Sequence, residues 1–299
     1  MLHRFRGLIA AALTLALAMP APALAWGGRG HKLIGELAYA RFTPEAKAMI
    51  DRLVALAPQQ EGAALCPVAS FADISTWADC VRGNEIASYA YMSELHYVNR
   101  SVHGAAPGAS FCPAGNCVTE AVRRAELVLS DGTAPELVRL LALEQLAHFL
   151  EDMHQPLHVG DNGDRGGNDV AVVPLGDGHA HNLHSLWDGD LVNAAVGADG
   201  ERVDLVRQLM AEHAARWQGQ TIEQWALESW GISQGYSYPT LPTPPTPGQT
   251  PADGGQISQA YVDGATPIVR QQIAKAAVRL AEMVNRAAAA ATLSPRRQR

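Results

Sequence analysis

The amino-acid sequence predicts an all-α fold with a single domain and one short β-hairpin. Three observations lead to this prediction. Apolar residues recur at helical spacing along most of the chain, proline-containing helix starts precede several of these stretches, and one segment stands out as a strand. With 299 residues, the chain is long enough to bury a sizeable hydrophobic core.

Residues 1–25 have the features of a secretory signal peptide. A basic start precedes an apolar run over Leu8–Met19, and Ala23-Leu24-Ala25 is a small-x-small cleavage site. The apolar run is too short to span a bilayer, and no later stretch is long enough. We therefore expect export to the periplasm or the medium, and one mature domain over residues 26–299. Two arginines leave with the peptide, which shifts the formal charge from −7 to −9.

Local signals predict where the first and last helices begin. Thr43-Pro44-Glu45 has Thr as N-cap and Pro at the first helical position, and helical spacing follows over residues 46–56. Thr266-Pro267 has the same form and predicts the start of the last helix.

The central helix is predicted from its own start and stop signals. Thr133-Ala134-Pro135-Glu136 has the form of a capping box that opens the helix carrying His148 and Asp152. Pro156 would end this helix and leave His158 on the exit loop.

The remaining segments are less regular. Residues 168–175 form the best strand candidate, half of a short hairpin after the glycine-rich turn 163–167. Residues 235–255 are rich in Pro, Thr and Gly, which predicts a long surface loop.

Two segments each hold a His and an Asp four residues apart, His148 with Asp152 and His184 with Asp188. On a helix, both side chains of such a pair leave the same face, one turn apart. Imidazole nitrogen and carboxylate oxygen are the ligands of catalytic zinc. One pair alone is often a solvated helix face. Two pairs within about forty residues, with His158 between them, predict a site for more than one metal ion.

The chain has four cysteines, all after the predicted cleavage site. An even number in an exported chain favours disulfides, but four cysteines allow three pairings and the sequence does not choose among them. We favour Cys112–Cys117, which would close a tight turn, and hence Cys66–Cys80. A thiolate zinc site is the competing interpretation, although the histidines and carboxylates already supply enough ligands.

Further motifs complete a recognisable set. Cleavage after Ala25 would make Trp26 the N-terminus, and a deprotonated α-amine is itself a nitrogen ligand. The motifs, in chain order, are Trp26-Gly-Gly-Arg-Gly-His31, Trp77-Ala78-Asp79, His96-Tyr97, His148-x-x-x-Asp152-x-His-Gln-Pro-Leu-His158 and Asn182-Leu-His184-x-x-Trp-Asp188. Together and in this order, they resemble the zinc-dependent single-strand nucleases and 3′-nucleotidases of the nuclease P-one and S-one type, along the whole mature chain.

The resemblance implies an all-α fold of the zinc phospholipase C and nuclease type that holds three zinc ions. Asp152 would bridge the first two ions. The implied ligands are Asp79, His96, His148 and Asp152 for one ion, Trp26 (amine and carbonyl), His31 and Asp152 for a second, and His158, His184 and Asp188 for the third.

The aspartate of the Trp-Ala-Asp motif has a competitor. Phe71-Ala72-Asp73 mimics Trp77-Ala78-Asp79, and on one helix the two aspartates would lie about 240° apart, so only one can face the site. We choose Asp79, because Arg82 follows one turn later, where the family has a cation near the scissile phosphate.

The resemblance also implies substrates and roles. Single-stranded DNA, RNA and 3′-nucleotides would be hydrolysed to 5′-phosphate products. Asp79 would orient the attacking water, and Arg82 would stabilise the developing charge. Tyr97 would stack on a base, and Asn168 would contact substrate or a metal-bound water. Asn99 stands where well-known members have Asp, so the base preference stays open.

Two other functions remain as alternatives. A secreted zinc phospholipase C resembles this family in fold and ligands, but its final helical ligand is Glu where this chain has Asp188. No amphipathic segment suited to a lipid surface is present. A zinc-scavenging protein would need neither Arg82 nor a stacking aromatic. The sequence implies no stable protein partner.

Overall fold

The computed structural model describes residues 26–106, 112, 114–176, 181–247, 249 and 252–293. The predicted signal peptide lies outside these residues. The α-helices are α1 (Gly27–Tyr39), α2 (Pro44–Val54), α3 (Phe71–Ile74), α4 (Trp77–Gly83), α5 (Val118–Ser130), α6 (Glu136–Met153), α7 (Pro156–Val159), α8 (Leu183–Ser185), α9 (Leu191–Val196), α10 (Val203–Trp217), α11 (Ile222–Ile232) and α12 (Gln259–Leu293). The 3-10 helices are η1 (Ala57–Gln59) and η2 (Ala87–His96), the π-helical turns are η3 (Leu186–Asp190) and η4 (Ser233–Ser237), and the strands are β1 (Arg100–Ser101), β2 (Gly160–Asp161), β3 (Val170–Val173), β4 (His181–Asn182) and β5 (Ala252–Gln256).

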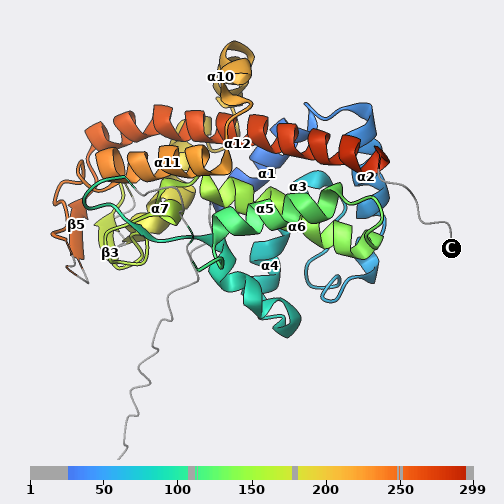
Figure 1. Ribbon diagram of the computed structural model, residues 1–299. Helices are drawn as coiled ribbons and strands as arrows, with labels where there is room; N and C mark the ends of the chain where they lie inside the picture. Colours follow the sequence, from blue (N-terminus) through green and yellow to red (C-terminus); the bar gives the residue numbers. More distant parts are fainter. Residues whose placement is uncertain are drawn as a thin grey trace, which may run out of the picture.

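The all-α prediction is confirmed. Helix α12 runs the length of the molecule (Figure 1) and packs against α1, α2, α5, α6, α9 and α10. Alanines and branched residues cover its buried side, among them Ile273, Ala277, Leu280 and Val284. Small side chains let helices approach closely, so this one helix provides a continuous core wall for its neighbours. None of the described helices is long and apolar enough to cross a membrane.

The predicted helix starts are correct at one position and wrong at two. Thr43 caps α2, because its hydroxyl accepts the amide hydrogen of Ala46 at 3.2 Å. Thr133 does not cap α6: its hydroxyl donates to Asp131 instead, and α6 begins after Pro135. Pro267 lies inside α12, which starts earlier, at Gln259.

Two small sheets stand beside the helices. β1 and β2 pair in parallel, with Arg100 opposite Gly160. The strand predicted at 168–175 is β3, which pairs antiparallel with β4 and parallel with β5. The loop prediction for 235–255 was therefore wrong in part, because β5 joins the sheet at the end of that segment.

The structure contains both favoured disulfides, Cys66–Cys80 and Cys112–Cys117. A thiolate zinc site is therefore absent at the cysteines that the structure describes.

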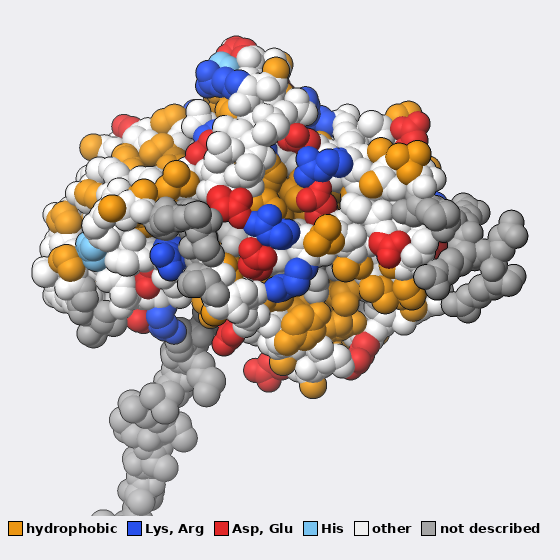
Figure 2. All heavy atoms as spheres, viewed as in Figure 1, with side chains coloured by type: hydrophobic (Ala, Val, Ile, Leu, Met, Phe, Trp, Pro, Cys, Tyr) orange, Lys and Arg blue, Asp and Glu red, His pale blue; other side chains and the backbone are white. Residues whose placement is uncertain are grey.

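Acidic and basic side chains alternate across the face shown in Figure 2. Ion pairs also join neighbouring helices: Arg123 with Glu223, Lys275 with Glu228, and Arg286 with Glu126. Among the residues that the structure describes, this face shows no continuous basic surface of the kind that binds duplex DNA.

Candidate metal centre

Eight His and Asp side chains from seven elements converge inside the helical layer, and all of them are buried. They are His31 on α1, Asp79 on α4, His96 at the end of η2, His148 and Asp152 on α6, His158 on α7, His184 on α8 and Asp188 on η3. Their ligand atoms form three groups within which every atom lies within 4.8 Å of the others. These are the His and Asp residues that the sequence singled out as metal ligands.

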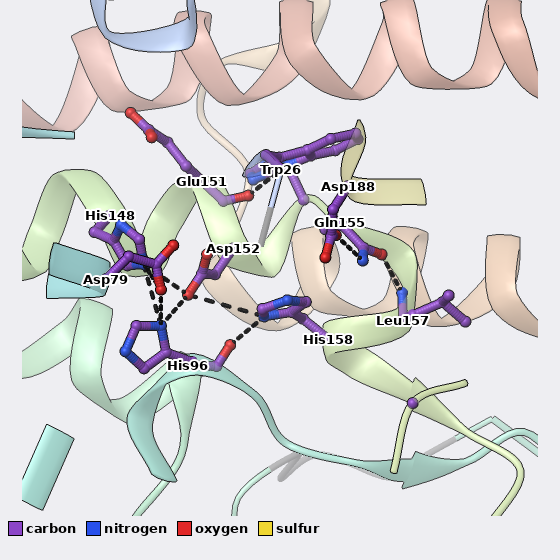
Figure 3. Close-up of polar contacts among 12 residues, drawn as sticks. Trp26, Asp79, His96, His148, Glu151, Asp152, Gln155, Leu157, His158 and Asp188 are labelled. Carbon is purple, nitrogen blue, oxygen red and sulfur yellow. Dashed lines mark hydrogen bonds and ion pairs between the residues drawn. The ribbon is translucent and has the colours of Figure 1, made fainter. Parts of the chain in front are cut away.

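The carboxylate of Asp152 lies between two sets of ligands (Figure 3). Its Oδ2 is 2.9 Å from Nδ1 of His96 and 3.3 Å from Nε2 of His148. Its Oδ1 faces Nε2 of His31 at 3.4 Å. Asp79 reaches the same space, with Oδ1 at 3.6 Å from Nε2 of His148. One carboxylate with its two oxygens aimed at different ligand sets suits a bridge between two ions.

Backbone carbonyls hold three of the histidine rings. Nδ1 of His148 donates to the carbonyl of Ser75 at 2.8 Å, and Nδ1 of His158 donates to that of His96 at 2.6 Å. Nδ1 of His184 donates to the carbonyl of Gly166 at 2.7 Å. Because the proton is held at Nδ1, the Nε2 lone pair of each ring is available as a ligand.

The spacing within the third group suits a cation. Nε2 of His158 and Nε2 of His184 face each other at 3.1 Å, although both Nδ1 protons are already donated elsewhere. Two opposed lone pairs repel unless a cation lies between them. Two ligands of a tetrahedral ion, each at ~2.0–2.1 Å, are roughly 3.3 Å apart. The observed spacing therefore suits a shared metal ion.

Buried polar atoms without a partner mark the same positions. Nε2 of His31, Oδ1 of Asp152 and Oδ2 of Asp188 have no hydrogen-bond partner among the described residues. Leaving such groups buried and unpaired is costly, about 1–3 kcal/mol for each neutral group and more for a charge. A bound ion would satisfy all three.

At His31 the carboxylates of Asp152 and Glu151 outweigh burial and raise the pKa well above its ordinary value. Burial favours the neutral form of three other histidines of this centre. It lowers the pKa of His96, His158 and His184 to about 4 each. Burial also raises the pKa of Asp188 well above its ordinary value. Burial opposes an ionised Asp152 too, but His148 and His158 outweigh it and hold its pKa well below the ordinary value. Neutral imidazoles around an ionised carboxylate are the protonation states that a metal ion requires.

Gln155, a motif residue that the sequence analysis did not single out, positions Asp188. Nε2 of Gln155 donates to Oδ1 of Asp188 at 2.7 Å, and Oε1 of Gln155 accepts the amide hydrogen of Leu157 at 2.6 Å. His184 and Asp188 lie on one helical stretch that changes to π-helical geometry at Leu186. His158 lies on the short helix α7 and not on the exit loop that we expected, because Pro156 ends α6 and also starts α7.

Asp79 and Asp73 lie on two separate helices, so the single-helix geometry expected for them was wrong. Asp73 pairs with Lys32 at 3.3 Å, away from the histidines. Asp79 points into the centre and accepts a hydrogen bond from Nη2 of Arg82 at 2.7 Å. Of the two aspartates, Asp79 therefore lies at the cluster of buried histidines, beside Arg82, and Asp73 does not.

The predicted N-terminal ligand, Trp26, is fully buried at the start of α1. Its indole Nε1 donates to the carbonyl of Glu151 at 2.8 Å, and its own carbonyl accepts the amide hydrogen of Gly30 at 3.0 Å. These contacts hold residue 26 beside α6. Coordination through its amine and carbonyl stays a prediction.

The predicted substrate residues lie outside the buried centre. Tyr97 and Asn99 are exposed directly after His96. Asn99 has a φ of 47°, a left-handed conformation that Asn tolerates better than most residues. The amide nitrogen of Asn168 donates to the carbonyl of Arg165 at 2.8 Å, so this part of its side chain braces the glycine-rich turn.

A family model described as S1/P1 Nuclease matches residues 26–289. The chain belongs to the S1/P1 nuclease family. It is therefore a nuclease, a hydrolase, and the assignment favours this function over the phospholipase C alternative.

The relatives are distant but cover most of the chain. Endonuclease 4 of Arabidopsis thaliana is 25% identical over 290 residues, which span 88% of this chain and 89% of the plant protein. Nuclease P1 of Penicillium citrinum is 24% identical and spans 87% of this chain and 97% of the fungal protein. Nuclease S1 of Aspergillus oryzae is 24% identical over 62% of this chain and 60% of its own length.

Proposed function

We propose that this nuclease is an exported phosphodiesterase with three zinc ions that cleaves single-stranded DNA and RNA to 5′-phosphate products and also acts on 3′-nucleotides. The observation that carries the proposal is the pair of buried Nε2 atoms of His158 and His184, 3.1 Å apart with no proton to share. The two groups that share His148 extend the same argument to further ions.

The proposed ligand sets are those that the family resemblance implies, and they divide the same buried His and Asp residues differently from the three groups. Asp79, His96, His148 and Asp152 would hold one ion, Trp26, His31 and Asp152 a second, and His158, His184 and Asp188 the third. Zinc at these positions would supply Lewis acidity: it would lower the pKa of a water toward neutrality and neutralise phosphate charge.

The protein side chains position the reactants. Asp79 would accept a hydrogen bond from the attacking water and so orient it. Arg82 donates to Asp79, and its guanidinium would stabilise the charge that develops on the phosphate. Tyr97 would stack on a base, Asn99 would contact the edge of that base, and Asn168 would contact substrate or a metal-bound water.

Single strands suit this site better than duplexes. The chain has a formal charge of −7, so attraction of phosphate depends on the local field at the centre and not on a basic surface. The ligands are buried, and a base and its phosphate must leave a duplex stack to reach them.

A paired measurement tests the proposal. Zinc content is measured on protein whose N-terminus is shown to be Trp26, and cleavage of single-stranded DNA and RNA is compared with hydrolysis of phosphatidylcholine. We expect about three zinc ions and nucleotide release. Zinc with lipid hydrolysis alone would overturn the substrate, and no zinc on the processed protein would overturn the metal centre.

A further inference from the structure

Glu151 contacts three parts of the metal centre without belonging to the predicted ligands. It precedes the bridging Asp152 on α6 and is fully buried. Its Oε2 lies 2.5 Å from Nδ1 of His31, and its Oε1 accepts the hydroxyl hydrogen of Ser75 at 2.8 Å. Its carbonyl accepts the indole hydrogen of Trp26 (Figure 3). A buried carboxylate is expensive unless its partners satisfy it, so these contacts have to be made together.

Ser75 connects the partner of His31 to the anchor of His148. Its hydroxyl donates to Glu151, while its carbonyl accepts the Nδ1 hydrogen of His148 at 2.8 Å. The rings of His31 and His148 stack with centroids 4.2 Å apart. One buried serine between α3 and α4 therefore fixes how both rings face the centre.

The space for this serine depends on a glycine of α1. A Cβ added at Gly35 would lie 2.4 Å from Oγ of Ser75, well inside contact distance. A Cβ added at Gly28, on the same helix, would meet nothing within 4 Å. Gly35 thus leaves room for the hydroxyl that reaches Glu151.

We propose that Glu151 is a positioning residue of the metal centre. It holds the Nδ1 proton of His31, so that Nε2 presents its lone pair to an ion, and Ser75 ties this arrangement to His148. A carboxylate on the far nitrogen of a ligating histidine fixes its tautomer and increases its basicity, and loss of such a partner costs 10–100-fold in metal affinity. The inference rests on the proposed function, since it assumes that His31 holds zinc.

Zinc release under a graded chelator tests the role of Glu151. Zinc-loaded, processed protein is titrated at pH 7, and zinc remaining per chain is measured for the native chain, Glu151→Gln and Glu144→Gln. Glu144 is a matched control, because it is also fully buried on α6 but bonds to Gln60. We expect Glu151→Gln to lose one ion at ~10–100-fold lower chelator strength, with Glu144→Gln like native. Equal release from all three, or equal weakening in both variants, would overturn the proposal.

A second pair of variants covers the case in which Glu151→Gln does not fold. Gly35→Ala displaces the Ser75 hydroxyl and should weaken retention of the same ion, whereas Gly28→Ala should not. With excess chelator, the free energy of unfolding should differ little between Glu151→Gln and Glu144→Gln. The two variants should differ in stability only when zinc is added. Equal retention in the two alanine variants would contradict the proposal. A native protein that binds zinc but cleaves no single strand would overturn the proposed function and leave this test intact.

Discussion

His148 and His154 are two fully buried histidines at the end of α6 that meet opposite environments. Each donates its Nδ1 hydrogen to a backbone carbonyl at 2.8 Å, that of Ser75 for His148 and that of Leu150 for His154. Nε2 of His148 faces the carboxylates of Asp79 and Asp152. Nε2 of His154 instead accepts a hydrogen bond from Nη1 of Arg279 at 2.9 Å.

The difference lies in where the positive charge comes from. On the side of His154, Arg279 is buried, lies over the ring of Trp225 and donates to Glu228 at 2.8 Å. Burial and Arg279 hold the pKa of His154 well below its ordinary value, so that ring stays neutral. On the side of His148, the carboxylates of Asp79 and Asp152 gather around buried imidazole rings, and in our proposal bound cations balance their charge. The same helix thus uses a guanidinium on one face and, in our proposal, metal ions on the other.

The largest effect is expected when the carboxylate of Asp152 is removed. Asp152→Asn should lose metal and activity together, with a drop in metal affinity beyond the ~10–100-fold expected for an outer partner, because a direct ligand of two ions is gone. Zinc content and cleavage rate measure this. A variant that stays fully metallated and fully active would contradict the scheme.

On the side of His154, a substitution should lower the stability of the fold and leave the metal content unchanged. Arg279→Ala removes the donor to Glu228, Gln220 and His154, while Glu228 keeps its ion pair with Lys275, so we expect a loss of about 1.5–3 kcal/mol in the free energy of unfolding. Urea denaturation measures it, with Arg207→Ala in an exposed pair as a control expected within about 1 kcal/mol of native. Zinc bound per folded chain should stay at the native level. Loss of zinc with unchanged stability would reverse the assignment of the two faces.

The buried glutamates of α6 extend the comparison to pH. Burial raises the pKa of Glu144 to about 8, so the folded state keeps its proton where the unfolded chain has lost it. The unfolded state therefore binds fewer protons above pH ~4.5, and stability falls as pH rises toward 8. Between pH 6 and 8, Glu144→Gln should gain up to about 2.7 kcal/mol relative to native. Urea denaturation at both pH values measures the gap, and a gap that does not change with pH would contradict this protonation state.

Tyr97 is exposed directly after His96, so its removal should leave the buried centre intact. Tyr97→Ala should lose base stacking worth ~1–3 kcal/mol, mainly as a raised KM, with zinc content and stability unchanged. Tyr91→Ala is the matched control, because Tyr91 is also exposed and lies on η2, before His96. Equal KM values for both variants would leave Tyr97 without a role in binding.

Local sequence signals predicted a helix start correctly where no competing contact intervened. Thr43 caps α2 because its hydroxyl needs only a neighbouring amide. Thr133 failed because the chain offered Asp131, an equally local competitor. Pro267 was mistaken for a helix start, since proline in a first turn and proline tolerated inside a packed helix have the same sequence pattern.

The candidate site shows the same division. Side chains in motifs, such as His148 and Asp152, could be found because their spacing carries the chemistry. Glu151 could not, because its partners His31 and Ser75 lie 120 and 76 residues away. β5 was missed for a related reason: a Gly-rich segment becomes a strand only when β3 lies beside it.

The most direct test of the central claim is thermal unfolding of the processed native protein after zinc removal and after zinc is restored, with zinc counted per chain. Our account predicts about three bound ions, a marked fall in Tm without zinc and full recovery when it returns. An identical Tm in both states, with no zinc retained, would show that hydrogen bonds alone hold the His148 face and would contradict the account.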